Sequence, residues 1–318
     1  MNLWRPPLLC ALVALSGFVS TASAGGTNTA FDFLRNDVSA RPAALAGSFV
    51  SVMNDPTTLF YNPATLGTLD KPAGSVGFFK YLLDINSGYV AYGQSFEDIG
   101  WFGAGIIYTN YGSFTEMDEL GNASGNTFGA SDLTLSVGYS NLLEENLYYG
   151  AALKFVYSSI ATYSSTALAG DLGLLYVLPE NRITLGISIR NIGAQLSTYM
   201  GVREDLPLDL TVGGSVVPKG LPLLLNVNVH RLNDATDTFG QRFNAFTVGG
   251  EFTLSKVLQL RFGYDNARRQ DLKIGTTSGL AGFSAGLGVS VKEYRFDYAI
   301  SSLGKIGELH RISVSSTF

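Results

Sequence analysis

The stretch Ile183-Thr184-Leu185-Gly186-Ile187-Ser188-Ile189-Arg190 decides the fold, because large apolar residues alternate in it with small or polar ones. A period of two is that of a β-strand whose two faces meet different surroundings. The same alternation recurs in residues 223–230, 258–264 and 294–300. These stretches predict strands that each have one apolar face.

Working outward from this stretch, fourteen segments between residue 73 and the C-terminus alternate in the same way. They cover residues 73–80, 87–96, 100–112, 129–140, 146–160, 165–178, 182–193, 206–218, 221–231, 243–254, 257–266, 280–291, 293–300 and 308–318. Outer-membrane barrels of bacteria need an even number of antiparallel strands, each about 9–11 residues long. The segments therefore predict an all-β fold, a 14-stranded antiparallel outer-membrane β-barrel.

The connections between these segments alternate between short and long, as a barrel with short periplasmic turns and long external loops requires. The long ones are 113–128, 194–205, 232–242 and 267–279, and the short ones lie near 97–98, 141–145, 179–181, 219–220, 255–256 and 292. A soluble β-sandwich, the alternative fold, has no reason to sort its loops in this way. The sorting favours the barrel.

The composition agrees with a membrane barrel and excludes other classes. Of the 318 residues 46% are hydrophobic and only 15% are charged, against about 25% charged in soluble domains. A disordered chain would need low hydrophobicity and high net charge, and a net charge of -5 gives no basic balance for nucleic acid. We expect outer-membrane lipid as a partner and no nucleic acid. The 20 Phe and 16 Tyr residues and the terminal Phe318 suit aromatic girdles.

Residues 1–24 predict a signal peptide. Arg5 supplies positive charge, residues 7–19 are mostly apolar, and Ala22-Ser23-Ala24 supplies the small residues of a cleavage site. The only cysteine, Cys10, lies inside this segment, so the mature chain is expected to have no disulfide. No other run of about 18 apolar residues exists, which excludes helical spans. The chain is therefore expected to leave the cytoplasm and, after cleavage near Ala24, to reside in the outer membrane as a barrel.

Residues 25–72 do not alternate and predict a separate N-terminal segment, followed by the barrel at 73–318. Residues 39–47 are typical of a short helix or turn that ends at Gly47. Asp55 before Pro56 predicts an N-cap and the start of another short helix. We expect this segment to plug the lumen; a periplasmic segment that packs under the barrel is the alternative.

The predicted inner face carries charges of both signs. They are Lys154, Arg190, Arg261, Arg295 and Arg311, with Asp171, Asp209, Glu251 and Asp297. Five cations against four anions favour paired charges that fill the lumen over a filter of a single sign. Packing and substrate contact both remain open as roles for this charge network. Inward-facing glycines, among them Gly173, Gly186 and Gly263, could make room for an inserted segment or let strands bend.

The sequence predicts no enzyme. It has two histidines, His230 and His310, no phosphate-binding glycine loop, and no cluster of residues at metal-ligand spacing. The sharpest catalytic hypothesis would place His230 beside Asn226 and Asn228 with a serine nucleophile. Polar residues two apart are what any barrel strand provides on its inner face. We therefore expect no catalytic, cofactor or metal residues.

A family resemblance covers most of the mature chain. A 14-stranded barrel with Asn62-Pro63-Ala64 in its N-terminal segment resembles the FadL-type outer-membrane proteins. Within that group it resembles the PorV/PorQ family of the type IX secretion system. The stretches that carry this resemblance are 31–34, 39–47, 84–92, 110–114, 118–122, 190–193, 204–210 and 279–283.

The resemblance implies a non-enzymatic anchor in protein export. It would hold a PorZ-like surface protein in an attachment complex with PorU-like and PorV-like proteins, and no catalytic residue carries over. The external connection 113–128 is the candidate docking loop, with Phe114, Glu116, Met117, Asp118, Glu119 and Leu120; a solvated acidic loop is the simpler reading. The alternative function is a FadL-like channel for small hydrophobic molecules.

Overall fold

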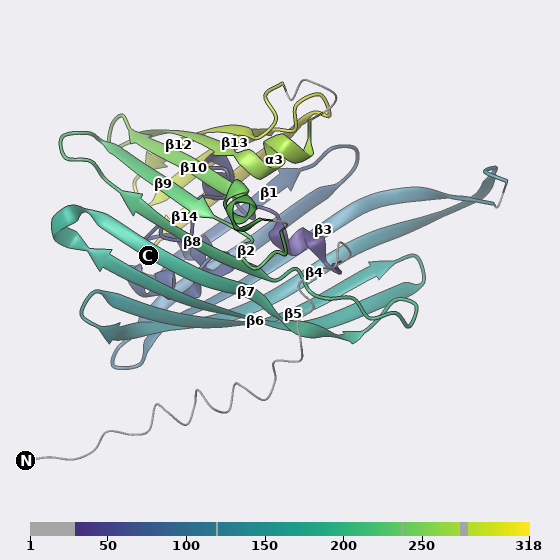
Figure 1. The fold of residues 1–318 in the computed structure, drawn as a ribbon, viewed down its shortest axis with the longest axis horizontal. Coiled ribbons are helices and arrows are strands. Elements are labelled where there is room, and N and C mark those ends of the chain that lie inside the picture. Colours follow the sequence, from purple (N-terminus) through teal and green to yellow (C-terminus); the bar gives the residue numbers. More distant parts are fainter. Residues whose placement is uncertain (1–28, 119, 237, 274–278) are drawn as a thin grey trace, which may run out of the picture.

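The chain forms a closed barrel of fourteen antiparallel strands (Figure 1). The computed structural model describes residues 29–318 except 119, 237 and 274–278. Each strand pairs with its neighbour in the chain, and the last strand closes the barrel on the first. The predicted fold is confirmed. The predicted signal peptide, residues 1–24, lies outside the described residues.

The strands follow the alternating segments of the sequence. They are β1 (Ala73–Lys80), β2 (Asn86–Phe96), β3 (Gly100–Met117), β4 (Ala123–Glu144), β5 (Leu147–Ile160), β6 (Tyr163–Leu178), β7 (Ile183–Ser197), β8 (Asp209–Val216), β9 (Leu223–Val229), β10 (Phe246–Thr253), β11 (Leu258–Asp265), β12 (Phe283–Val291), β13 (Tyr294–Ser302) and β14 (Glu308–Thr317). At the seam, Val76 of β1 lies opposite both Val90 of β2 and Val314 of β14.

The two faces of the wall differ as the alternation predicts. Leu153 is 52% exposed on the outer surface, whereas the next residue, Lys154, is 4% exposed inside. The same contrast separates Ile106 from Ile107 on β3. An apolar exterior around a polar interior is the pattern of a barrel that faces lipid.

The connection predicted as a loop over 113–128 is a β-hairpin, and that prediction is wrong for its flanks. β3 continues to Met117 and β4 starts at Ala123. Phe114 stacks on Phe128 across the two strands, with ring centroids 5.4 Å apart. Such cross-strand pairs stabilise a ladder beyond the barrel, and the hairpin extends past the other strands (Figure 1).

At the end of the barrel that carries the β3–β4 hairpin, two other connections are longer than the hairpin turn and contain helical turns. The 3-10 helix η6 (Phe239–Asn244) lies between β9 and β10, and helix α3 (Asn266–Asp271) follows β11. At the opposite end the connections are short and include the 3-10 turn η5 (Pro179–Asn181). None of the helices that the structure describes is long and apolar enough to cross a membrane.

The N-terminal segment lies inside the barrel (Figure 1). It contains η2 (Asp32–Arg35), α2 (Ala40–Ala44), η3 (Pro56–Phe60) and η4 (Pro63–Thr68). The side chain of Asp55 accepts a hydrogen bond from the Thr57 amide, so the predicted cap is confirmed. The helix predicted before Gly47 is also present: the Gly47 amide donates to the carbonyl of Pro42 at 2.9 Å, and its φ is +75°. That left-handed φ favours glycine.

Small residues of the wall allow the N-terminal segment to approach it closely. A Cβ on Gly150 would strike the backbone of Pro63 and Ala64, and a Cβ on Gly263 would strike the backbone at Leu45 and Ala46. Larger apolar side chains then fill the remaining space, with Leu45, Phe49, Leu59 and Leu66 buried between segment and wall. The core of the molecule is therefore the packed lumen.

Candidate functional site in the barrel lumen

A closed ring of six alternating charges joins the N-terminal segment to the barrel wall. Each carboxylate lies between two arginines, and each arginine lies between two carboxylates. In order around the ring the members are Arg41, Glu251, Arg261, Asp297, Arg295 and Asp55. The six charges sum to zero, so the ring neutralises its own members away from water.

On the side of the barrel wall, the ion pairs of the ring are short and buried. Arg261 Nε lies 2.6 Å from Glu251 Oε2, and Arg261 Nη1 lies 2.6 Å from Asp297 Oδ1. Arg295 Nε donates to Asp297 Oδ2 over 2.8 Å. Arg261 is only 1% exposed. Removing one member of so buried a group would leave uncompensated charge, which is strongly destabilising.

Two residues of the N-terminal segment complete the ring. Arg41 holds Glu251 with Nε and Nη2, at 2.8 and 2.9 Å, in a bidentate pair. Asp55 Oδ2 accepts hydrogen bonds from Arg41 Nη1 at 3.1 Å and from Arg295 Nη2 at 2.8 Å. Because Glu251, Arg261 and Arg295 stand on β10, β11 and β13, the ring fixes the segment against three strands.

The ring also keeps Asp55 ionised. Burial acts to raise the pKa of this carboxyl, but the positive charges of Arg295 and Arg41 outweigh burial and lower the pKa to about 2. Hydrogen bonds from Thr57 add to the same effect. The aspartate therefore stays charged, and the ring stays complete, across the neutral and mildly acidic range.

A second group of charges lies on β5 to β8. Lys154 Nζ lies 2.6 Å from Asp171 Oδ2 and donates to Asn191 Oδ1 at 2.9 Å. Asn191 lies at a bulge of β7 with a φ of +62°, and its backbone N–H donates a hydrogen bond to Asp171 Oδ1. Arg190 pairs with Asp209. Its Nη1 also donates to the carbonyl of Phe60, which ties this group to the N-terminal segment.

Arg311 differs from the other predicted charges. Its Nε donates to the backbone carbonyl of Asp37 at 3.3 Å, and its guanidinium lies over the rings of Phe79 and Tyr81. Within the described part of the chain no ion pair of Arg311 is found. Carbonyl and aromatic contacts satisfy this cation instead.

Arg41 and Asp55 were not among the residues that the sequence points to as members of the charge network. The inner faces of strands can be read from alternation, but the N-terminal segment has no such period. The one available signal is the Asp55-Pro56 cap, which uses Oδ1 and leaves Oδ2 for the arginines.

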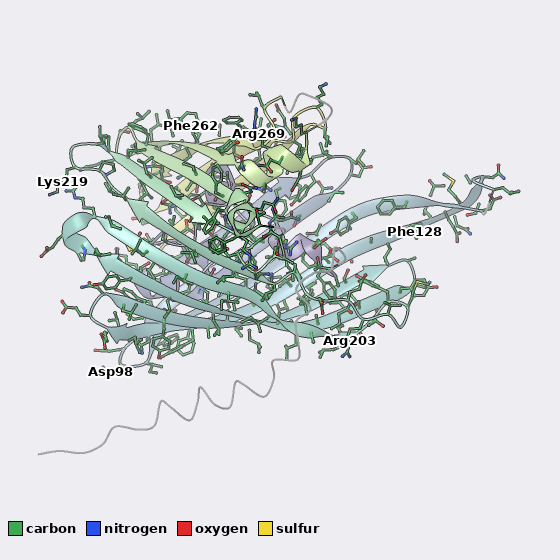
Figure 2. The ribbon with its side chains drawn as sticks, viewed as in Figure 1. Asp98, Phe128, Arg203, Lys219, Phe262 and Arg269 are labelled. Carbon is green, nitrogen blue, oxygen red and sulfur yellow. The ribbon has the colours of Figure 1, made fainter. Side chains whose placement is uncertain are left out.

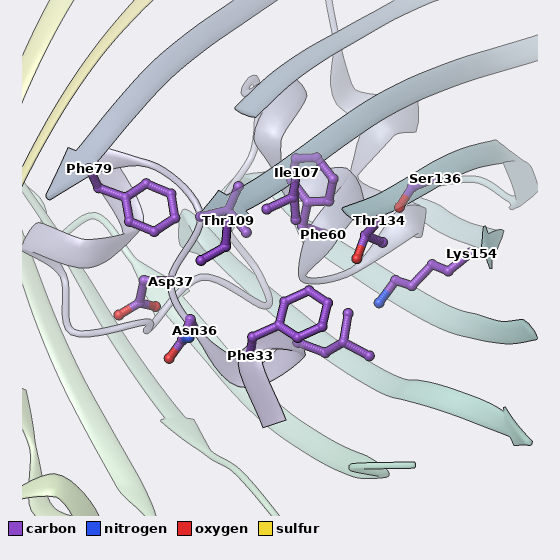
Figure 3. Close-up of a pocket in the computed structure, with 12 residues that line it drawn as sticks. Phe33, Asn36, Asp37, Phe60, Phe79, Ile107, Thr109, Thr134, Ser136 and Lys154 are labelled. Atoms are coloured by element: carbon purple, nitrogen blue, oxygen red, sulfur yellow. The ribbon is translucent and has the colours of Figure 1, made fainter. Parts of the chain in front are cut away.

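A small cavity lies between the N-terminal segment and one side of the wall (Figure 3). It is lined by Phe33, Leu34, Asn36, Asp37, Val38, Phe60, Phe79, Ile107, Thr109, Thr134, Ser136 and Lys154. Six of these twelve residues are apolar. The buried hydroxyls of Thr134 and Ser136 have no hydrogen-bond partner among the described residues, so a polar group of a ligand could meet them.

A larger, polar cleft opens at the end of the barrel with the longer connections. It has a volume of about 360 Å³, and its lining includes Arg35, Asn36, Asp37, Tyr61, Arg190, Asp209, His230, Arg231, Arg268 and Asp271. Asn36 and Asp37 line both the cleft and the small cavity. Residues 32–37 therefore form the partition between the two.

The residues of the candidate docking loop lie on the hairpin. Phe114, Glu116 and Met117 stand on β3, Asp118 and Leu120 belong to the turn at its tip, and Glu119 lies outside the described residues. Leu120 is 87% exposed and Met117 59%. These side chains are remote from the lumen and form a separate surface.

The geometry around His230 does not resemble a catalytic triad. Its two ring nitrogens lie 3.1 Å from Thr211 Oγ1 and 3.0 Å from Thr247 Oγ1. Threonine hydroxyls on neighbouring strands thus occupy both nitrogens, and no serine is bonded to the ring in the described part of the chain. Nor do three or more His, Cys, Asp or Glu residues gather at a metal site within that part.

Comparison with known proteins gives a fold. No family model matches the sequence, and no curated protein matches it. Solved structures do match: the toluene transporter TodX of P. putida has 17% identity, with a TM-score of 0.61, over 90% of this chain and 99% of its own. The toluene transporter TbuX of Ralstonia pickettii has 14% identity, with the same TM-score and coverage.

A FadL homologue of Pseudomonas aeruginosa has 12% identity and a TM-score of 0.57, over 88% of this chain and 98% of its own. Each of the three is matched almost over its whole length. This chain has the fold of the FadL-type outer-membrane barrels.

Proposed function

We propose that this protein is an outer-membrane barrel that binds a small, mostly apolar molecule in its lumen and lets it pass. The small cavity behind Phe33 and Leu34 carries this proposal, because apolar walls there meet a few unpartnered hydroxyls. Ligand sites of this kind combine an apolar lining with a small number of polar groups that orient the ligand. The fold shared with two toluene transporters supports the same function.

The ring of charges argues against a wide aqueous pore. It spans from the N-terminal segment to β10, β11 and β13, and five of its six members are buried, with Arg295 half-buried. A molecule that enters from the polar cleft must instead pass residues 32–37, which separate the cleft from the cavity. The expected route therefore lies on the side of the lumen next to β3, β4 and β5.

Two neighbouring isoleucines provide a matched test. Ile107 lines the cavity and is 9% exposed, whereas Ile106 points outward and is 46% exposed. Uptake of radiolabelled toluene would be measured in a host that lacks hydrocarbon channels. We expect Ile107→Trp to reduce uptake to the level of the empty host and Ile106→Trp to leave it unchanged. Equal uptake by both variants, at equal surface levels, would contradict a transport route through the cavity.

The second candidate function is that of the PorV/PorQ family: an anchor for a PorZ-like surface protein, in a complex with PorU-like and PorV-like proteins. One observation favours it, namely the hairpin of β3 and β4, which extends beyond the barrel and exposes Phe114, Met117 and Leu120. Surfaces with exposed apolar side chains commonly bind other proteins.

Deletion of the gene separates the two functions. Loss of toluene uptake with normal attachment of surface proteins supports the channel. Normal uptake with cargo released into the medium supports the anchor, and it contradicts the first proposal.

A further inference from the structure

The segment from the turn before β2 to the first half of β5 carries charges of a single sign. Residues 81–153 include nine Asp and Glu but no Lys, Arg or His. Part of this charge lies on the hairpin, where Glu116 and Asp118 are exposed. Because the hairpin stands clear of the barrel (Figure 2), cations of the other loops do not neutralise it at close range.

One face of the hairpin combines an aromatic pair with a positioned carboxylate. The rings of Phe114 and Phe128 are stacked at an interplanar angle of 27°. Glu116 Oε2 accepts hydrogen bonds from Ser124 Oγ and from Asn126 Nδ2, each at 3.0 Å. Phe114 and Glu116 are two residues apart on β3 and so share a face. The Glu116 carboxylate is therefore held on the same face as the rings, and its Oε1 has no partner among the described residues.

The tip of the hairpin is also ordered by its own hydrogen bonds. Asp118 Oδ1 accepts from the amides of Leu120 and Asn122, at 2.9 and 2.8 Å, and Oδ2 accepts from Asn122 Nδ2. These bonds lower the pKa of Asp118, so its charge persists at neutral pH. A face that is ordered before binding loses less conformational entropy when a partner docks.

We propose that this hairpin face, formed by Phe114, Glu116 and Phe128, binds an arginine side chain on a basic protein partner. A guanidinium stacks on aromatic rings and forms directed hydrogen bonds to a carboxylate, and the face offers both contacts together. The anionic phosphates of a lipid surface carry the wrong sign for it. The inference rests on the second candidate function in one respect, namely that a partner protein exists. The chemistry of the hairpin face does not depend on that function.

A labelled peptide of Arg-Leu-Gly repeats, with blocked termini, is the probe. Its fluorescence anisotropy would be titrated with the purified full-length barrel in detergent. We expect Glu116→Gln to weaken binding about tenfold, because a charge-assisted hydrogen bond is lost. Phe128→Leu should weaken binding about threefold through loss of stacking. Replacement of Arg by Lys in the peptide should also weaken binding, since lysine lacks the planar fork.

Glu97→Gln is the matched control, because it removes the same charge from an exposed turn at the opposite end of the barrel, beside Asp98 (Figure 2). We expect no change in affinity for it. Equal losses in Glu97→Gln and Glu116→Gln would show general electrostatic attraction and would overturn the proposal. Undiminished peptide binding by Glu116→Gln would also overturn the proposal. Self-association that depends on the hairpin, measured by sedimentation, would overturn it as well, because the occupant of the face would then be a second copy of this chain. The two proposals can also fail separately. If the peptide binds as expected but surface proteins are attached normally after deletion of the gene, only the second candidate function is contradicted.

Discussion

The two parts of the N-terminal segment are held in the lumen in different ways. Between residues 38 and 69 almost every side chain is buried, and the ring through Arg41 and Asp55 fixes this part to three strands. Residues 29–37 rest instead on fewer contacts, namely one parallel bridge from Thr29 to Asp205 and apolar contacts of Phe31, Phe33 and Leu34. Asp37 adds an ion pair with Arg268, 3.6 Å long, and its carbonyl accepts a hydrogen bond from Arg311 Nε. The pair Asp32–Arg35 is 3.9 Å long, with Asp32 exposed and Arg35 half-buried.

The difference indicates that residues 38–69 form a fixed inner plug. Residues 29–37, which include the partition of residues 32–37, form an outer partition that is easier to displace. The predictions below test the contrast between the two parts.

The largest effect is expected from Arg261→Met. The substitution leaves Glu251 and Asp297 without their shared partner inside the lumen, and breaking a buried ion pair costs about 3–5 kcal/mol. Urea unfolding of the folded barrel in detergent measures the loss. Lys219→Met, in an exposed turn (Figure 2), is the control and should change the free energy of unfolding by less than about 0.5 kcal/mol. Equal stabilities of the two variants would show that the ring does not hold the plug.

Gly150→Val should destabilise the barrel by up to about 3 kcal/mol, because the new side chain meets the backbone of Pro63 and Ala64, which cannot move aside. Displacement of the inner plug should also raise ion conductance in planar bilayers. At Gly129 a Cβ would find only the Gly112 carbonyl oxygen, at 3.6 Å, so Gly129→Val is the control. A closed, fully stable Gly150→Val barrel would contradict the close packing.

The contribution of Asp55 should depend on pH. Its pKa is lowered to about 2 in the folded protein, from an ordinary value of 3.8, which corresponds to about 2 kcal/mol of stabilisation. A lowered pKa gives stability that is fully present above pH 4 and is lost as the pH falls toward 2. The difference in unfolding free energy between the wild type and Asp55→Asn should therefore shrink over that range. A difference that stays constant down to pH 2 would show that the charge of Asp55 is not what stabilises the ring.

The smallest effect is expected in the outer part. Arg35→Gln removes a partly exposed pair at 3.9 Å, and such pairs contribute about 0.5 kcal/mol or less. The urea midpoint should therefore match that of the wild type. A loss above 1 kcal/mol would mean that the outer part is anchored by charge as firmly as the inner part.

Alternation along the chain is sufficient to predict the wall, because the period of a strand is a local property. Residues 73–80 were predicted as a strand and form β1 without change. The hairpin was missed because small and polar residues, such as those from Ala123 to Thr127, break the apolar period while the ladder continues.

The candidate site is only half visible in the sequence. Glu251, Arg261, Arg295 and Asp297 follow from the inner face of their strands. Their partner Arg41 lies 210 positions from Glu251 in the chain, and no local pattern encodes a contact over that separation. The cavity depends in the same way on how residues 33–38 lie against four strands.

Disulfide locks provide the most direct test of a fixed plug behind a displaceable partition, because Cys10 is the only cysteine of the chain. Ser51→Cys with Ser215→Cys would lock the inner plug to β8, since the hydroxyl oxygens of these two serines lie 2.6 Å apart and sulfur atoms in their place are within reach of a disulfide bond. Thr29→Cys with Asp205→Cys would lock the outer partition across its β-bridge. Toluene uptake should be normal with the inner lock, and should be lost with the outer lock and restored by a reductant. Uptake that is blocked by the inner lock and unaffected by the outer one would contradict the proposed route.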